Sequence, residues 1–294
     1  MGSLDGRVAL ITGAGHGLGR EHALLFASEG AKVLVNDLDV RLDGSPLQAS
    51  AAQQVVDEIV AGGGEAVAHH GDVADFESAR AMVHAAIDSF GRLDVLVNNA
   101  GFVRDSYLHK MTEQQFDDVI RVHLKGHFAP LRHATDHWRE RSKAGELVRG
   151  AVINTMSGSG TNMPNPGQLN YGAAKAGIAA MTLVAAAELG RIGVRVNAIS
   201  PVARTRATLA TPGPIGDMMK PPEDPEEFDT YHPRHVSALV AFLATADCSI
   251  TGKAFQVHGG QINELTGWTL EEAITSDGDW TVESVADALG VTVA

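Results

Sequence analysis

The sequence predicts an α/β fold built around a parallel sheet of about seven strands. Two observations support this prediction: short β-branched runs alternate with longer helical patterns, and a glycine-rich turn links the first run to the first helix. Strands and helices that alternate at this spacing are typical of βαβ units with right-handed crossovers. The expected strands cover residues 7–12, 32–36, 65–70, 93–98, 150–156, 194–199 and 253–258.

Between these strands, apolar residues recur at helical spacing. The expected helices run from the glycine-rich turn to residue 29 and over 47–61, 75–90, 112–139, 169–191 and 234–246. Two segments break the alternation. The first, 201–233, is rich in proline and is expected to be a lid or a binding loop. The second has only a weak helical pattern near 281–289, so we expect one domain over 1–263 and an acidic C-terminal extension over 264–294.

Composition narrows the class of protein. The 294 residues include 23 Lys and Arg against 36 Asp and Glu, a formal charge of −13, without the basic clusters that nucleic-acid binders use. No run of 18 apolar residues occurs, so we expect no membrane span, and the single cysteine, Cys248, favours a cytoplasmic location. Most of the acidity lies in 217–229, with six acids and one lysine, and in 264–294, with seven acids and no basic residue. The remaining body is close to neutral and is compatible with an anionic cofactor.

The first expected strand leads into the turn Thr12-Gly-Ala-Gly-His-Gly-Leu-Gly19, and a helix follows. Glycines at such a turn let the backbone approach a pyrophosphate, which the free N–H groups and the helix dipole attract. Asp37, at the end of the second strand, can accept hydrogen bonds from the adenosine ribose and would repel a 2′-phosphate, so NAD is expected rather than NADP. The alternative is that the glycines make only a tight turn and that Asp37 caps a loop.

Two further patterns follow the third and fifth strands. Asp72 stands where a carboxylate could bind the adenine amino group, with Val73 beside the ring, although Asp72 could equally cap the next helix. Tyr171 and Lys175 are four residues apart and therefore share one helix face. A tyrosine with a pKa of about 10 is a poor base at neutral pH, and a nearby cation favours its phenolate, which can then exchange a proton with an alcohol. A hydroxyl at the end of the fifth strand, Ser157 in our preferred interpretation, could polarise the carbonyl.

These motifs together resemble the short-chain dehydrogenase/reductase family over about residues 5–263. The family's TGxxxGxG turn matches residues 12–19, its NNAG strand end matches residues 98–101, and its YxxxK pair matches Tyr171 and Lys175. The resemblance implies a Rossmann-type, doubly wound sheet with NAD at the carboxyl ends of the strands. It implies that Tyr171 is the acid/base, that Lys175 binds the nicotinamide ribose and lowers the pKa of Tyr171, and that Ser157 orients the substrate. The implied cofactor-binding residues are Gly13, Gly17, Leu18, Gly19, Asp37, Asp72, Val73, Asn99, Ala100, Gly101, Tyr171, Lys175, Pro201 and Thr205.

The chain departs from the family pattern in three places. Ser157 precedes Tyr171 by 14 positions, where relatives often show 13, so Ser159 is the alternative hydroxyl. His123 replaces the family's usual Asn, which helps to hold a water next to the lysine; imidazole can also donate and accept, so His123 is expected to keep this catalytic relay. The usual Pro-Gly after the sixth strand is Pro201-Val202.

Within the family, His123 and the strand end 36–38 are similar to one branch. That branch includes the (3R)-hydroxyacyl-CoA dehydrogenase unit of peroxisomal multifunctional β-oxidation enzymes and its single-domain bacterial relatives. The resemblance suggests an NAD-dependent oxidoreductase that interconverts a secondary alcohol and a ketone, with a 3-hydroxyacyl-CoA or steroid-type substrate. It also suggests a homodimer or homotetramer. The alternatives are a small or cyclic secondary alcohol as substrate, and a dinucleotide-binding regulatory or scaffold protein without turnover.

The remaining histidines and the arginines after the sixth strand allow other interpretations. The pairs His123/His127 and His133/His137 are at i, i+4, but neither has the internal Glu of a zinc motif, so no metal is expected. Apart from His123, these histidines are expected at the surface or an interface. Four basic residues could meet the phosphates of a CoA ester, or could simply be solvated: Arg104, Lys110, Arg204 and Arg206.

Overall fold

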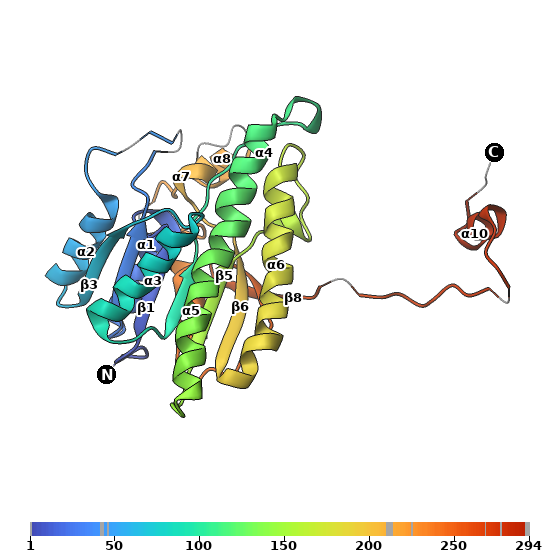
Figure 1. Ribbon diagram of the computed structural model, residues 1–294. Helices are drawn as coiled ribbons and strands as arrows, with labels where there is room; N and C mark the ends of the chain where they lie inside the picture. Colours follow the sequence, from blue (N-terminus) through green and yellow to red (C-terminus); the bar gives the residue numbers. More distant parts are fainter. Residues whose placement is uncertain are drawn as a thin grey trace.

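The computed structural model describes residues 2–41, 44–45, 47–209, 214–224, 226–267, 269–276 and 278–291. Its sheet has the strand order β3-β2-β1-β4-β5-β6-β7-β8, and the first seven strands are parallel, which confirms the predicted α/β fold (Figure 1). The order reverses between β1 and β4, where the two halves of a doubly wound sheet meet. The strands are β1 (Val8–Thr12), β2 (Lys32–Asp37), β3 (Glu65–His70), β4 (Val95–Asn98), β5 (Gly150–Thr155), β6 (Val194–Pro201), β7 (Ala254–His258) and β8 (Gln261–Leu265).

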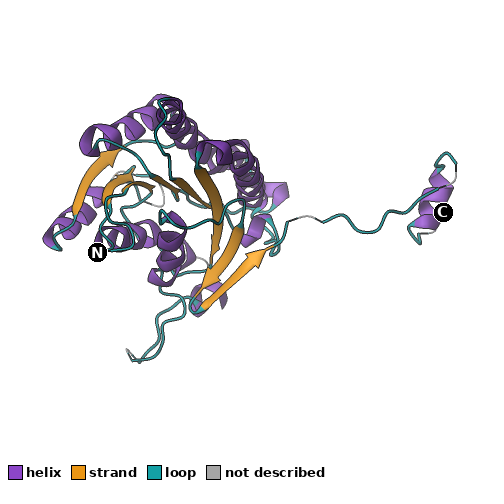
Figure 2. Ribbon diagram, turned by 90° about the horizontal axis from the view of Figure 1, so that it is seen from below, coloured by secondary structure: helices purple, strands orange, loops and turns teal. Residues whose placement is uncertain are grey.

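Helices cover both faces of this sheet because successive side chains of a buried strand point to opposite sides. Side chains of β1 such as Ile11 pack with α1 (Gly17–Ser28), α2 (Ala51–Ala61) and α9 (Arg234–Ala244). Leu10 points the other way and belongs to the core under α3 (Phe76–Phe90), α5 (Gly126–Lys143) and α6 (Leu169–Leu189). Figure 2 shows the two helix layers with the strands between them.

An eighth strand extends the sheet beyond the seven that the sequence predicts. β8 runs antiparallel to β7 and returns through a two-residue turn, Gly259-Gly260, in which Gly259 has φ +48. Four of the five β8 residues are exposed, so the segment lacks the apolar run that marks the buried strands. β8 also reaches Leu265, two residues past the expected end of the domain at residue 263.

The long helix expected over 112–139 consists of three pieces. α4 (Glu113–Ile120) is followed by one π-helical turn (Arg121–Lys125), and α5 then continues to Lys143. At the junction, the amide of Gly126 donates to the carbonyls of Arg121 and His123. Such π turns occur often at functional sites, and this one carries His123.

The two segments that break the alternation contain short helices. The proline-rich segment holds α7 (Arg206–Leu209) and α8 (Pro214–Met218), and the C-terminal extension holds α10 (Val282–Ala288), which lies apart from the sheet in Figures 1 and 2. Within the described ranges, one helical stretch, Leu169–Ile192, is long and apolar enough to cross a membrane by length and composition. It contains α6, which packs on β6 and carries the buried Lys175.

Candidate active site

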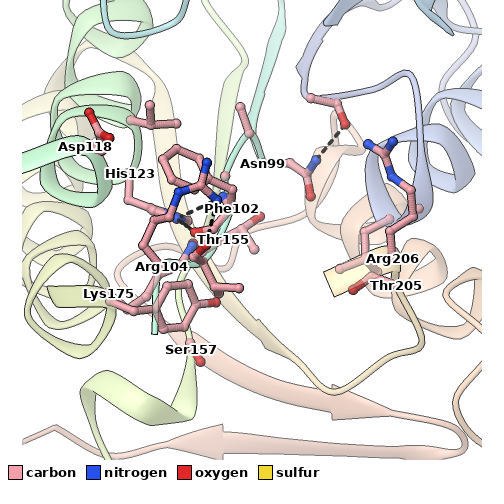
Figure 3. Close-up of a pocket in the computed structure, with 18 of the residues that line it drawn as sticks. Asn99, Phe102, Arg104, Asp118, His123, Thr155, Ser157, Lys175, Thr205 and Arg206 are labelled. Atoms are coloured by element: carbon pink, nitrogen blue, oxygen red, sulfur yellow. Dashed lines mark hydrogen bonds between the residues drawn. The ribbon is translucent and has the colours of Figure 1, made fainter. Parts of the chain in front are cut away.

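One cavity of about 920 Å³ opens at the carboxyl ends of β1, β2, β4, β5 and β6. In an open α/β sheet, ligands bind at this edge, next to the point where the strand order reverses. The expected cofactor and catalytic residues line this cavity with the exception of Gly19. In Figure 3, Lys175 and Ser157 lie on one side of it, and Thr205 and Arg206 lie on the other.

The glycine-rich turn is shaped for close approach of a ligand and of a neighbouring strand. Gly13 has φ +62, and a Cβ there would lie 2.7 Å from the Cα of Ala100, so no larger residue fits. Gly19 faces away from the cavity, since a Cβ there would lie 2.3 Å from the carbonyl oxygen of Gly13. Gly19 therefore supports the turn from behind, whereas Gly17 and Leu18 line the cavity.

The N-terminus of α1 is open to an anion. Its N-cap residue, His16, makes no side-chain capping hydrogen bond, and the first turn holds no acidic residue. The first backbone N–H groups of a helix need partners, and a phosphate at this position supplies them. The diphosphate of a dinucleotide therefore fits this turn.

Asp37 lies at the carboxyl end of β2 and borders the same cavity. Its Oδ2 accepts a hydrogen bond from the amide of Gly15 at 2.9 Å, and its Oδ1 accepts one from the amide of Asp39 at 2.9 Å. The carboxylate thus holds the glycine turn and keeps a negative charge at the place that an adenosine ribose would occupy.

The NNAG segment at the end of β4 ties two strand ends together. The side-chain amide of Asn99 donates to the carbonyls of Thr12 and Gly13 at 3.0 and 3.1 Å. The hydroxyl of Thr12 accepts from the amides of Asn99 and Ala100 at 3.0 and 3.2 Å. These bonds fix Asn99 and Ala100 at the floor of the cavity.

Asp72 lines the cavity beside Val73, as expected for an adenine subsite. Its Oδ1 accepts from the amide of Ala74 at 2.8 Å, and its Oδ2 accepts from Arg121 at 2.7 Å. The alternative role of helix cap belongs to Asp75, whose carboxylate accepts from the amide of Ser78 at the start of α3. Asp72 therefore shapes the turn after β3 and fixes Arg121.

Tyr171 and Lys175 meet on one face of α6, as their spacing predicts. The Nζ of Lys175 lies 5.4 Å from the centre of the Tyr171 ring and donates to the carbonyl of Thr155 at 2.6 Å. Burial lowers the pKa of Lys175 to about 7. Burial raises the pKa of Tyr171, hydrogen bonding with Ser157 lowers it, and the Asp105 carboxylate raises it. In the free protein Tyr171 therefore carries its proton at neutral pH.

The structure distinguishes the two candidate serines. The hydroxyl of Ser159 donates to Gln168 at 2.8 Å and accepts from the amide of Asn165 at 2.9 Å, so it belongs to a network at the rim. Ser157 directly follows Met156, accepts from the amide of Ser159 at 3.3 Å and interacts with Tyr171. Ser157 is the hydroxyl next to the phenol, as the sequence analysis prefers.

His123 is buried next to Tyr171, with the two rings edge to face at 5.1 Å. Its Nε2 lies 2.6 Å from the carbonyl oxygen of Phe102 and 3.1 Å from the amide of the same residue. Burial lowers the pKa of His123 to about 3, so the ring is neutral. It therefore fixes the backbone that follows the NNAG segment, and no direct hydrogen bond to Lys175 is found between these described side chains.

Two expectations about the other polar residues are wrong. His127 is 1% exposed and is not a surface or interface residue, because α5 turns this face, with Leu131, Ala134 and Trp138, onto the sheet. Arg204 does not face the cavity, because Asp229 and the carbonyl of Met219 bind its guanidinium.

Arg104 and Arg206 do line the cavity, whereas Lys110 is exposed outside it. His133 and His137 are partly exposed. Within the described part of the chain, no group of three or more His, Cys, Asp or Glu side chains is placed to hold a metal ion.

Three functional groups have weak or no sequence signals. The acceptor for Lys175 is a backbone carbonyl, that of Thr155, and no residue type marks it. Asp105 and Gln168 come together from distant segments, with a hydrogen bond of 3.0 Å, and form the rim above Tyr171 with Ser159. Position alone, after the NNAG turn and before the YxxxK pair, would have been the only indication of either residue.

Comparison with known proteins now decides the family. The family described as short chain dehydrogenase matches residues 7–210. The chain belongs to the short-chain dehydrogenase family. It is 42% identical over 282 residues to "Hydroxyacyl-CoA dehydrogenase ChsB1" of Mycobacterium tuberculosis, which covers 94% of this chain and 84% of that protein.

Two further short-chain dehydrogenase relatives support this assignment. "Peroxisomal multifunctional enzyme type 2" of Mus musculus is 40% identical over 261 residues, which cover 89% of this chain and 33% of that enzyme. A crystal structure of a short chain dehydrogenase from Mycobacterium avium is 51% identical, with a TM-score of 0.86, over 100% of this chain and 98% of that chain.

As a member of this family the chain is an oxidoreductase that acts between hydroxyl and keto groups. Family members typically bind a nicotinamide dinucleotide, and the open α1 N-terminus, the Gly13 turn and Asp37 fit one. A bound nicotinamide dinucleotide would supply the hydride acceptor or donor for the substrate carbon. Tyr171 is placed to exchange the proton at the substrate oxygen, and Ser157 is placed to orient that oxygen. Lys175, held by the carbonyl of Thr155, lies near enough to the Tyr171 ring to favour the phenolate when it carries its proton.

Proposed function

We propose that the protein is an NAD-dependent dehydrogenase that interconverts a secondary alcohol and a ketone. The observation that carries this proposal is the convergence of Ser157, Tyr171 and Lys175 on one wall of the cavity whose opposite wall is the glycine turn. In oxidation, the phenolate form of Tyr171 would take the hydroxyl proton while NAD, when bound, accepts the hydride; in reduction, the protonated form would give its proton to the carbonyl oxygen.

Asp37 supports NAD rather than NADP as the cofactor. Its carboxylate is fixed by the amides of Gly15 and Asp39 and cannot turn away from a 2′-phosphate without losing both hydrogen bonds. A fixed negative charge repels a phosphate and accepts hydrogen bonds from ribose hydroxyls.

The proposed substrate is a 3-hydroxyacyl-CoA or a steroid-type substrate. The relatives named for hydroxyacyl-CoA and peroxisomal multifunctional enzymes support this choice. Arg104 stacks on the Phe102 ring at 4.7 Å at the substrate side of the cavity, where a cation suits an anionic substrate. A small or cyclic secondary alcohol is the alternative substrate.

A panel of substrates tests the proposal and its alternatives. With NAD, 3-hydroxyacyl-CoA esters are expected to produce NADH absorbance at 340 nm faster than steroid or simple alcohols do, and NADP is expected to be a poor substitute. If only simple or cyclic alcohols are turned over, the result would contradict the proposed 3-hydroxyacyl-CoA or steroid-type substrate and support the alternative, a small or cyclic secondary alcohol. Tight NAD binding without turnover of any substrate would instead indicate a regulatory or scaffold protein.

Tyr171→Phe tests whether Tyr171 transfers the proton. The change removes the phenol hydroxyl and keeps the ring that packs against His123, so kcat is expected to fall by at least about a hundredfold. NADH affinity, measured by fluorescence titration, is expected to change less than twofold. Persistent turnover in this variant would show that another group moves the proton.

We further propose a homodimer or homotetramer in a reducing compartment, the cytoplasm. Large apolar side chains are exposed on the outer faces of α5 and α6, among them Phe128, Leu183 and Val184, and such side chains often mark interfaces. The single cysteine, Cys248, is buried, which suits a protein without disulfides.

A further inference from the structure

Arg206 lines the cavity across from the catalytic residues, and the proposed chemistry gives it no role. It is the first residue of α7, directly after Thr205, and both line the cavity together with Gly17 of the glycine turn. Figure 3 shows Arg206 and Thr205 on the far side of the cavity from Lys175 and Ser157. Among the residues that the structure describes, no acidic side chain forms an ion pair with Arg206.

The start of α7 lies against the N-terminus of α1. A Cβ on Gly17 would lie 3.7 Å from the Cγ2 of Thr205, an ordinary van der Waals contact across the gap between the two helices. Burial lowers the pKa of His16, the N-cap of α1, and the charge of the nearby Arg206 lowers it further. The Nε2 of His16 is buried and has no hydrogen-bond partner. His16 and Gly17 at the uncapped N-terminus of α1 therefore line the same cavity as the guanidinium-bearing Arg206.

Arg204 explains how α7 is held in this position. Its guanidinium is bound to the Asp229 carboxylate and to the carbonyl of Met219, and its backbone amide donates to the carbonyl of Tyr231 at 2.7 Å. Residues far apart in the proline-rich segment are thus fixed to the end of β6. The two arginines have different tasks: Arg204 fastens the segment, and Arg206, two residues later, faces the cavity.

We propose that Arg206 binds the diphosphate of the dinucleotide from the side opposite the N-terminus of α1. This inference rests on the proposed dinucleotide function. A guanidinium forms paired, charge-assisted hydrogen bonds with phosphate oxygens, which suits a group already held by helix amides on its other side. The bond makes α7 part of the cofactor site, so that binding of the dinucleotide holds the first helix of the proline-rich segment over the cavity.

Ligand-binding measurements on the intact protein test this role without any turnover. Wild type, Arg206→Gln and Arg206→Lys are titrated with NADH, with ADP-ribose, which carries the diphosphate without the nicotinamide, and with adenosine, which carries no phosphate. Arg206→Gln is expected to weaken NADH and ADP-ribose by about tenfold, the size of one lost charged hydrogen bond. The affinities of Arg206→Lys for NADH and ADP-ribose are expected to lie between those of wild type and Arg206→Gln. The adenosine affinity of each variant is expected to stay within twofold of wild type.

Lys220→Gln is the matched control, because Lys220 lies in the same segment, is solvent-exposed and pairs only with the nearby Asp217 among the described residues. Its affinity for ADP-ribose is expected to equal that of wild type, and its melting temperature controls for folding. Unchanged ADP-ribose affinity in Arg206→Gln would overturn the inference, as would an equal loss for adenosine. A loss confined to coenzyme A, titrated in parallel, would also overturn it by assigning Arg206 to the substrate. If wild type binds neither NADH nor ADP-ribose, the proposed dinucleotide function itself fails.

Discussion

Lys175 shows how a single catalytic residue costs stability. It is 2% exposed, and burial lowers its pKa from the usual 10.5 to about 7. As the pH falls from 10.5 to 7, Lys175 is protonated in the unfolded chain but still largely neutral in the folded chain. The folded state therefore loses stability as the pH falls through this window. Below pH 7 both states hold the proton and the loss stays constant.

Lys175→Met is expected to remove this cost. The lowered pKa corresponds to about 4 kcal/mol at pH 7, so the variant should unfold with a free energy above that of wild type by this amount less the lost hydrogen bond to Thr155. The difference should shrink as the pH rises towards 9.5. Denaturant unfolding at several pH values measures the difference. Lys125→Met, at an exposed lysine, should show no such pH dependence. A pH-independent difference for Lys175→Met would mean that burial does not lower the pKa of Lys175.

At the scale of elements, the loop after β4 and the π turn are built against each other. A Cβ on Gly101 would lie 2.2 Å from the Cε1 of His123, a contact that real side chains do not make. The same imidazole holds the backbone of Phe102, so any shift of the ring moves the wall of the cavity. Glycine is thus required at position 101 because the His123 ring fills the space that a Cβ would take.

Gly101→Ala is expected to lower the free energy of unfolding by about 2 kcal/mol because it overpacks this contact. In the background of His123→Asn the same change should cost much less, since the ring atoms that it meets are gone. A double-mutant cycle by denaturant unfolding measures the coupling, expected to be at least about 1 kcal/mol. Gly190→Ala, where a Cβ meets open space, is the control. Equal costs in both backgrounds would contradict the proposed contact.

The same elements show what sequence patterns can and cannot predict. Spacing alone placed Tyr171 and Lys175 on one face, because both lie in one regular helix. The π turn, by contrast, is a difference of backbone hydrogen bonding that no residue type marks, and β8 is too exposed to carry an alternating pattern. His127 was predictable, because Leu131, Ala134 and Trp138 follow it at helical spacing and place it on the buried face.

For the whole molecule, exposed apolar side chains occur both on the outer faces of α5 and α6 and on the acidic C-terminal extension. The acidic C-terminal extension continues past β8, away from the sheet (Figure 1). On the helices that cover the sheet, α5 exposes Phe128, and α6 exposes Leu183 and Val184. A stable interface usually buries about 800 Å² on each partner. A few side chains at its centre carry most of the binding energy. The exposed apolar side chains of Leu183 and Val184 on α6 therefore support the proposed association of two copies.

Val184→Glu tests this arrangement. The exposed side chain should leave the fold of one subunit intact, but a buried carboxylate at an interface costs several kcal/mol, so the dimer or tetramer should dissociate. Light scattering after size-exclusion chromatography should then report about 30.9 kDa, the mass of one chain, where wild type shows a multiple of it. Val60→Glu places the same charge on an exposed site of α2, on the opposite face of the sheet, and should keep the wild-type mass. If Val184→Glu and Val60→Glu both keep the multimeric mass of wild type, the subunits do not associate through this face of α6. If wild type itself has a mass of 30.9 kDa, the subunits do not associate at all.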